Sequence, residues 1–150
     1  MTPSSEIPTD FPSTGRLAGV DFGTVRIGVA ITDPSRILAS PYCNYTRRSL
    51  EADADFFREL ADEERVAAWI VGLPLHAGGE ESRKSMEARQ FGKWLKDVTG
   101  LPVAFFDERF TSKEAERILG VAGATRKKKK KHTDTIAAQI LLRDFLASQS

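Results

Sequence analysis

Two apolar runs, each preceded by a segment with helical spacing, constrain the fold of this chain most strongly. The runs cover residues 67–73 and 103–106, and both are continuously apolar rather than alternating with polar residues. A continuous apolar run is typical of a parallel strand that is covered on both faces. Alternation of such strands with helices predicts an α/β fold with a mixed sheet.

Apolar residues three or four positions apart mark the helical segments. The first set is Leu50, Ala54, Phe57 and Ala61, and the second is Ala88, Phe91, Leu95 and Val98. Each set forms one face of an amphipathic helix. Gly100 and Pro102 then predict the end of the second helix. A capping box at Thr111 and Glu114 predicts a third helix through Leu119, and a last helix is expected to begin near Thr133.

The first part of the chain predicts a β-hairpin. A short apolar run at 16–20 ends at Asp21, and apolar residues alternate with others over 25–32. A weaker third strand is expected over 36–44, where Pro41 limits it to an edge position. With the two apolar runs at 67–73 and 103–106, the sheet is predicted to have five strands.

The length of 150 residues fits one domain with a single core. Residues 1–15 are rich in Pro, Ser and Thr and are predicted to be a flexible tail, which leaves one domain at 16–148. No apolar run approaches the roughly 20 residues of a membrane span, and the first residues lack the features of a secretory signal. With a single cysteine, Cys43, the chain is expected to be cytoplasmic and not bound to membranes.

Acidic residues follow two of the predicted parallel strands. Right-handed crossovers bring the carboxyl ends of the strands at 17–21, 67–73 and 103–107 to one edge of the sheet, where ligands bind in open α/β folds. Asp21 follows the first strand and is either a site residue or the cap of a hairpin turn. Asp107 and Glu108 end the third strand, and because strand side chains alternate, at most one of them can face a shared site.

Asp134 lies on the apolar face of the last predicted helix. Its spacing places it on one stripe with Ala137, Ala138, Leu141 and Phe145. An interaction with the helix dipole in the first turn would explain why residue 134 is acidic, but it would not explain why this acid lies on the apolar face of the helix. A carboxylate on that face beside other acids is expected to need a cation, and Mg²⁺, with its preference for oxygen ligands, fits.

The basic residues are concentrated in one segment, although the formal net charge is only +1. Six of the 22 Lys and Arg residues stand together at Arg126, Lys127, Lys128, Lys129, Lys130 and Lys131. Such a run is either a solubilising loop or a contact for a phosphate backbone. Its place just before Asp134 favours the second interpretation, which implies a nucleic-acid partner.

These segments together resemble the YqgF family, also called RuvX, which is described as Holliday junction resolvases with an RNase H-like fold. The resemblance runs from about Leu17 to Leu146. It is carried by GVDFGTVRIGVAITD, by IVGLPL with a glycine loop, by FFDERFTSKEAE, and by a basic stretch leading into HTDTIAAQILLRDFL. The unbroken lysine run is more extreme than the family pattern, and the N-terminal tail falls outside it.

The resemblance implies an RNase H-like sheet flanked by helices and a set of catalytic, metal-binding acids. By the resemblance these would be Asp21, Glu108 and Asp134, with Asp107 as the alternative to Glu108. Arg26 and Arg109 would contact phosphate, as would the basic run. Mg²⁺ would be the cofactor, with Mn²⁺ as a substitute.

Three functions are compatible with these residues. A metal-dependent nuclease that processes the 5′ end of the 16S ribosomal RNA precursor is favoured, and a resolvase of four-way DNA junctions is the first alternative. The second is a non-catalytic RNA-binding module of ribosome assembly. An actin-like or sugar-kinase-like ATP enzyme is ranked low, because 150 residues provide only one of the two domains that such enzymes close around a nucleotide. The chain is expected to be a monomer or a weak homodimer.

Overall fold

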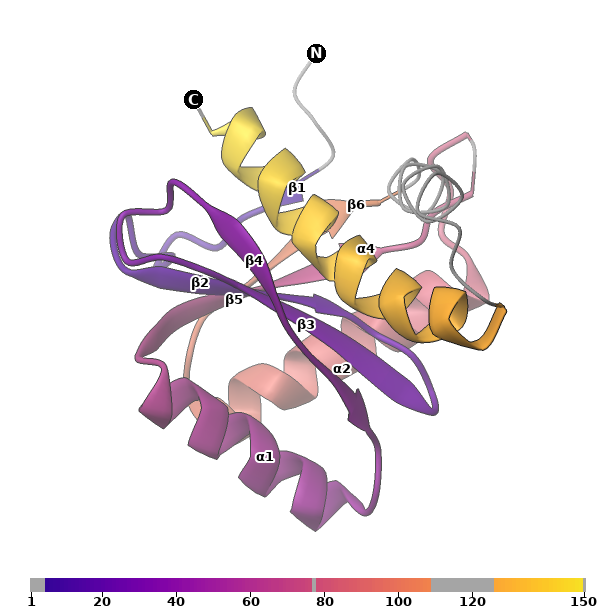
Figure 1. Ribbon diagram of the computed structural model, residues 1–150. Coiled ribbons are helices and arrows are strands. Elements are labelled where there is room, and N and C mark those ends of the chain that lie inside the picture. Colours follow the sequence, from indigo (N-terminus) through magenta and orange to yellow (C-terminus); the bar gives the residue numbers. More distant parts are fainter. Residues whose placement is uncertain (1–4, 77, 109–125, 150) are drawn as a thin grey trace.

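A computed structural model gives the protein a mixed six-stranded sheet with helices on both faces (Figure 1). The structure describes residues 5–76, 78–108 and 126–149; over residues 126–134 it gives the helix but not the side chains. The strand order is β1-β6-β5-β2-β3-β4. The strands are β1 (Ser5–Glu6), β2 (Arg16–Asp21), β3 (Arg26–Thr32), β4 (Ala39–Thr46), β5 (Val66–Leu73) and β6 (Val103–Asp107).

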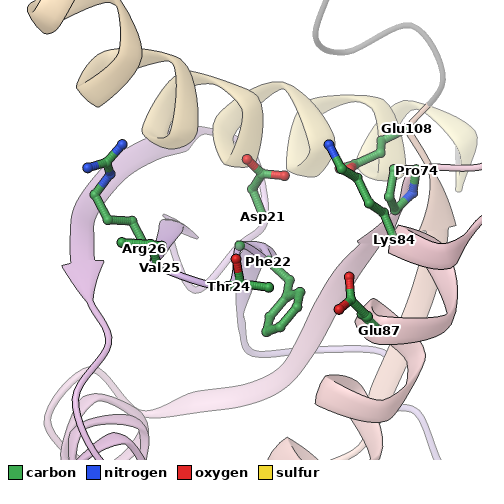
Figure 2. A pocket seen from close by; sticks show the side chains of 10 residues that line it. Asp21, Phe22, Thr24, Val25, Arg26, Pro74, Lys84, Glu87 and Glu108 are labelled. Atoms are coloured by element: carbon green, nitrogen blue, oxygen red, sulfur yellow. The ribbon is translucent and has the colours of Figure 1, made fainter.

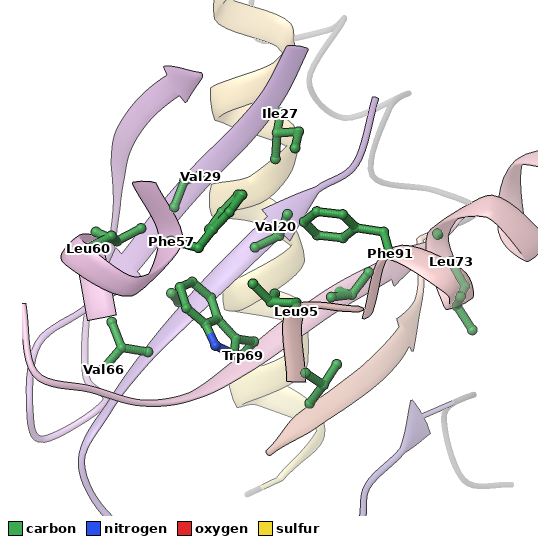
Figure 3. Close-up of a cluster of buried hydrophobic side chains, with 14 residues drawn as sticks. Val20, Ile27, Val29, Phe57, Leu60, Val66, Trp69, Leu73, Phe91 and Leu95 are labelled. Atoms are coloured by element: carbon green, nitrogen blue, oxygen red, sulfur yellow. The ribbon is translucent and has the colours of Figure 1, made fainter. Parts of the chain in front are cut away.

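The described helices are α1 (Leu50–Glu63), α2 (Arg83–Thr99) and α4 (Arg126–Ser148). Helices α1 and α2 cover one face of the sheet, and α4 crosses the other face over β2, β3 and β4 (Figure 1). The core is accordingly split into two clusters. Phe57, Trp69 and Leu95 are central in the cluster beneath α1 and α2 (Figure 3). Ile70, Leu141 and Phe145 belong to the cluster beneath α4.

The predicted α/β fold is confirmed, and so are its parallel strands. β2 pairs with β5 in parallel, and β5 pairs with β6 in parallel, so the carboxyl ends of all three lie at one edge. β2 and β3 form the expected antiparallel hairpin, and β4 is an edge strand that contains Pro41. Gly100 caps α2 in the left-handed conformation, with φ of 72°.

The N-terminal segment differs from the flexible tail that the sequence predicted. Residues Ser5 and Glu6 form β1, which pairs with β6 and adds the sixth strand. Phe11 packs edge-on against Phe145 of α4, with ring centres 6.0 Å apart. The composition of this segment is polar, but the pairing of β1 with β6, the Phe11 ring contact and an ion pair of Glu6 with Arg89 attach it to the domain.

The last helix begins at Arg126 rather than near Thr133. The basic run therefore forms the first turns of α4 and is not a loop. Lys and Arg have high helix propensity, and no Gly or Pro interrupts residues 126–148, so the helix continues through the run. The capping box at Thr111 and the helix expected after it lie outside the described residues. In the part that is described, none of the helices has the length and apolar character needed to cross a bilayer.

Candidate active site at the carboxyl edge of the sheet

Asp21 and Glu108 line one pocket at the carboxyl edge of the parallel strands. The pocket has a volume of about 550 Å³. Asp21 is the last residue of β2, and Glu108 directly follows β6, which is separated from β2 by β5. In Figure 2 the carboxylate of Asp21 points toward α4. Two acids that are far apart in the sequence are thus brought together because parallel strands end at the same edge.

Side-chain alternation explains why Glu108 rather than Asp107 reaches this pocket. In β6, Phe106 belongs to the core cluster beneath α4, whereas Phe105 packs against the cluster beneath α2. Asp107, like Phe105, is therefore on the α2 side, and Glu108 is on the α4 side. In β2, Leu17 packs beneath α4, so Asp21 is on the same side as Glu108.

Glycine residues make room for the acids on this face. A Cβ atom built on Gly72 would lie 2.7 Å from Cδ of Glu108, so the Glu108 side chain occupies the space that a side chain at position 72 would need. Gly28 pairs with Asp21 across the hairpin. The Glu108 backbone is fixed as well, because its N–H donates to the Leu73 carbonyl at 3.1 Å.

The electrostatic environment of Glu108 disfavours its charged form. Burial raises the pKa of the Glu108 carboxyl well above its usual value, and the negative charges of Asp21 and Asp107 raise it further. This is the environment expected where several carboxylates meet at a position suited to a cation.

Basic and polar side chains complete the pocket. Arg26, at the start of β3, lines it together with the exposed Thr24. Lys84 and Glu87 were not predicted as site residues, and they line the pocket from the first turns of α2. Both could have been found from the order of elements, because the helix that follows β5 must begin at the carboxyl edge of the sheet. His76 does not line the pocket.

Several predicted site residues cannot be placed in the pocket. Arg109 lies outside the described residues, and for Arg126 to Lys131 and Asp134 only the helical backbone is described. Among the side chains that are described, no group of three His, Cys, Asp or Glu residues is arranged to hold a metal ion. The described acids of the pocket at the sheet edge are Asp21, Glu108 and Glu87.

Comparison with known proteins identifies relatives along nearly the whole chain. The family model described as "RuvX: Holliday junction resolvase" matches residues 15–148. A protein of Rhodopirellula baltica named "Putative pre-16S rRNA nuclease" is 56% identical over 136 residues, which are 91% of this chain and 79% of that protein. A protein of Koribacter versatilis with the same name is 37% identical over 132 residues, 88% of this chain and 86% of that protein.

The fold is also found in a solved structure. RuvC of T. thermophilus in complex with a Holliday junction substrate matches with a TM-score of 0.53 and 17% sequence identity, over 91% of this chain and 96% of that one. At this identity the similarity concerns the fold alone, which is the predicted RNase H-like one. The family model and the curated relatives show that this chain belongs to the RuvX family of Holliday junction resolvases.

Proposed function

We propose that this protein is a metal-dependent nuclease that cleaves phosphodiester bonds at the 5′ end of the 16S ribosomal RNA precursor. The observation that carries the proposal is the convergence of Asp21 and Glu108 on one pocket that Arg26 and Lys84 also line. The acids would hold a divalent cation, which would supply an activated water as the nucleophile, and the basic side chains would bind the phosphate that this water attacks. The names of the curated relatives support RNA as the substrate. Ribosomal RNA maturation would place the protein in the cytoplasm.

The oxygen donors of the pocket fit a divalent metal ion. Mg²⁺ takes carboxylate oxygens and retains several waters, and Mn²⁺ accepts similar ligands. Asp21 and Glu108 would hold the ion from two different strands, and Gly72 leaves the space in which Glu108 lies. A bound divalent ion supplies an activated water and stabilises the leaving oxygen in phosphodiester hydrolysis.

Asp134 is the proposed third ligand. Position 134 is one helical turn before Ala138, whose backbone oxygen lies close to Gly19 of β2. It is also more than two turns beyond Arg126, where α4 begins, so a role as helix cap or first-turn acid does not apply. Position 134 therefore lies in the interior of α4 and shares a helical face with Ala138, which is the placement expected of a ligand.

The remaining residues would orient the nucleic acid. Arg26 and Lys84 line the pocket on different elements, β3 and α2, and would hold a phosphate between them. Charge-assisted hydrogen bonds to phosphate are stronger than neutral ones and fix the strand before reaction. The basic run at the start of α4, with Arg109, would extend this contact along the backbone of the substrate.

A direct test compares two substrates under the same conditions. The purified protein is incubated with a 5′-extended 16S precursor RNA and with a four-way DNA junction, each with Mg²⁺ and with a chelator. The proposal predicts cleavage of the RNA that requires the metal. The family description keeps junction cleavage as a second candidate, and preferential cutting of the DNA junction would establish it instead. Binding of RNA without cleavage, unaffected by chelator, would establish the non-catalytic alternative.

A further inference from the structure

A second pocket opens beside the candidate active site, and aromatic side chains form much of its wall. It has a volume of about 300 Å³, which is at the lower end of the range for small-molecule sites. Phe22, Thr24 and Glu87 line both pockets, so the two are neighbours. The other lining residues are Arg47, Leu50, Gln90, Phe91 and Trp94.

The aromatic wall of this pocket is held in place by the core. The ring centre of Phe22 is 4.7 Å from that of Phe91, which in turn is 5.6 Å from that of Trp94. Phe91 is buried against Phe57 in the cluster beneath α1 and α2, whereas Phe22 and Trp94 are only partly buried. The wall is therefore rigid, and part of its ring surface remains open to solvent.

A positive charge is fixed at the same pocket. The guanidinium carbon of Arg47 lies 5.4 Å from the centre of the Phe22 ring. Arg47 Nε donates a hydrogen bond of 3.2 Å to the buried carboxylate of Asp53, and this bond restricts where the guanidinium can go. Aromatic rings combined with a basic side chain are the means by which proteins bind unpaired nucleotides.

We propose that this second pocket binds one unpaired base of the substrate strand while a neighbouring phosphate lies at Asp21 and Glu108. The proposal rests on the nuclease function proposed above and narrows its substrate to a single-stranded or unpaired segment. A base inside a continuous duplex is stacked and paired, and it would have to leave the helix before it could enter. If the aromatic wall is only the edge of the core, the strand is held by its phosphates alone, and individual bases do not matter.

The test removes bases from the RNA rather than side chains from the protein. Binding of single-stranded RNA of about ten nucleotides, a length within the usual site size, is measured by fluorescence anisotropy. Ca²⁺ replaces Mg²⁺ to slow cleavage, and each RNA of the series carries one abasic nucleotide at a different position. At one position, loss of the base is expected to weaken binding by about 5- to 150-fold, the effect of one stacked base.

A variant of the pocket then shows whether that base contacts the aromatic wall. Trp94→Leu keeps an apolar side chain on α2 but removes the ring. In this variant the sensitive abasic position is expected to weaken binding by less than about twofold, because the contact is already lost. Met86→Ala is the matched control: Met86 is an exposed apolar residue of the same helix, lines neither pocket, and its variant should retain the wild-type response.

Two results would overturn the proposal. One is a uniform small effect of every abasic position, and the other is a base-specific loss that is just as large in Trp94→Leu. Cleavage of the intact RNA with Mg²⁺ is measured in parallel. Cleavage without a base-specific loss rejects the base pocket and leaves the nuclease function standing. A base-specific loss without any cleavage rejects the nuclease function and leaves the binding pocket standing.

Discussion

The side chain of Glu108 lies over Gly72, so that a Cβ atom at position 72 would come within 2.7 Å of Glu108 Cδ. Gly72 belongs to β5, which runs between the strands that carry Asp21 and Glu108. Because Gly72 of β5 has no side chain, the carboxylate of Glu108 can lie over β5.

Replacement of Gly72 by Ala should displace Glu108 and reduce cleavage by about 100-fold, the usual cost of a misplacement near 1 Å in an active site. Steady-state cleavage rates and a thermal melt would be measured together. Gly78→Ala is a suitable control, because its methyl group would meet only the carboxylate end of the exposed Glu80. A Gly72→Ala variant that cleaves normally would show that the carboxylate position does not matter.

Asp107 and Glu108 should respond differently to the same change. Because the strand directs them to opposite faces, Glu108→Gln is expected to lower kcat/KM by more than about 100-fold, beyond the 10- to 100-fold range for groups that only orient a ligand. Asp107→Asn should reduce cleavage only slightly. If Asp107→Asn proved to be the inactive variant, the site would be shifted by one residue.

Asp53 should matter chiefly for stability. Its carboxylate is 1% exposed and accepts hydrogen bonds from the Tyr45 hydroxyl at 2.7 Å, the Arg48 N–H at 2.9 Å and Arg47 Nε at 3.2 Å. Asp53→Ala is expected to lower the free energy of unfolding by about 1.5–3 kcal/mol, the range for hydrogen bonds to a charged group. Urea unfolding at neutral pH would measure this, with Tyr45→Phe as the smaller, single-bond comparison.

The stability that Asp53 contributes should depend on pH in a defined direction. Burial raises the pKa of the Asp53 carboxyl, but hydrogen bonds from Tyr45, Arg48 and Arg47 outweigh burial and hold the pKa below its ordinary value of 3.8. A lowered pKa means that the contribution is complete above about pH 4 and is lost as the pH falls through the lower, folded-state pKa. The difference between wild type and Asp53→Ala should thus shrink in strong acid. A difference that grows there would contradict the assigned charge.

The basic run should act through charge alone. Replacement of Lys127 to Lys131 by Gln preserves helix propensity at the start of α4 while it removes five charges. Binding should weaken for all RNA sequences, and the slope of log K against log salt should fall by about 0.7 for each phosphate contact that is lost. Binding titrations at several salt concentrations would measure the slope. An unchanged slope would mean that the run only aids solubility.

Much of the fold followed from local patterns in the sequence. Continuous apolar runs predicted β5 and β6, and the right-handed crossover rule then made β2, β5 and β6 parallel. The same rule brought Asp21 and Glu108 to one edge. Side-chain alternation in β6 places Asp107 and Glu108 on opposite faces of the sheet. The packing of Phe105 and Phe106 then shows which face each acid is on.

The features that were missed depend on contacts between distant segments. Nothing local marks Ser5 and Glu6 as a strand, because β1 exists only through its pairing with β6. The start of α4 at Arg126 was missed because a lysine run was interpreted by its charge rather than by its helix propensity. The aromatic pocket joins Phe22 of one loop to Trp94 of α2, and no spacing along the chain relates these two residues.

Asp21, Glu108 and Asp134 are proposed to act together as one metal site. The most direct measurement is the thermal melt with and without Mg²⁺, set beside cleavage of the 16S precursor, for wild type, Asp21→Asn and Asp134→Asn. Removing one of several mutually repelling acids should leave each metal-free variant at least as stable as wild type. The stabilisation by Mg²⁺ should shrink, because a weakened site binds less metal, and cleavage should be lost. Variants that are destabilised without metal, respond to Mg²⁺ as wild type does, and still cleave RNA would show that these acids do not form a metal site.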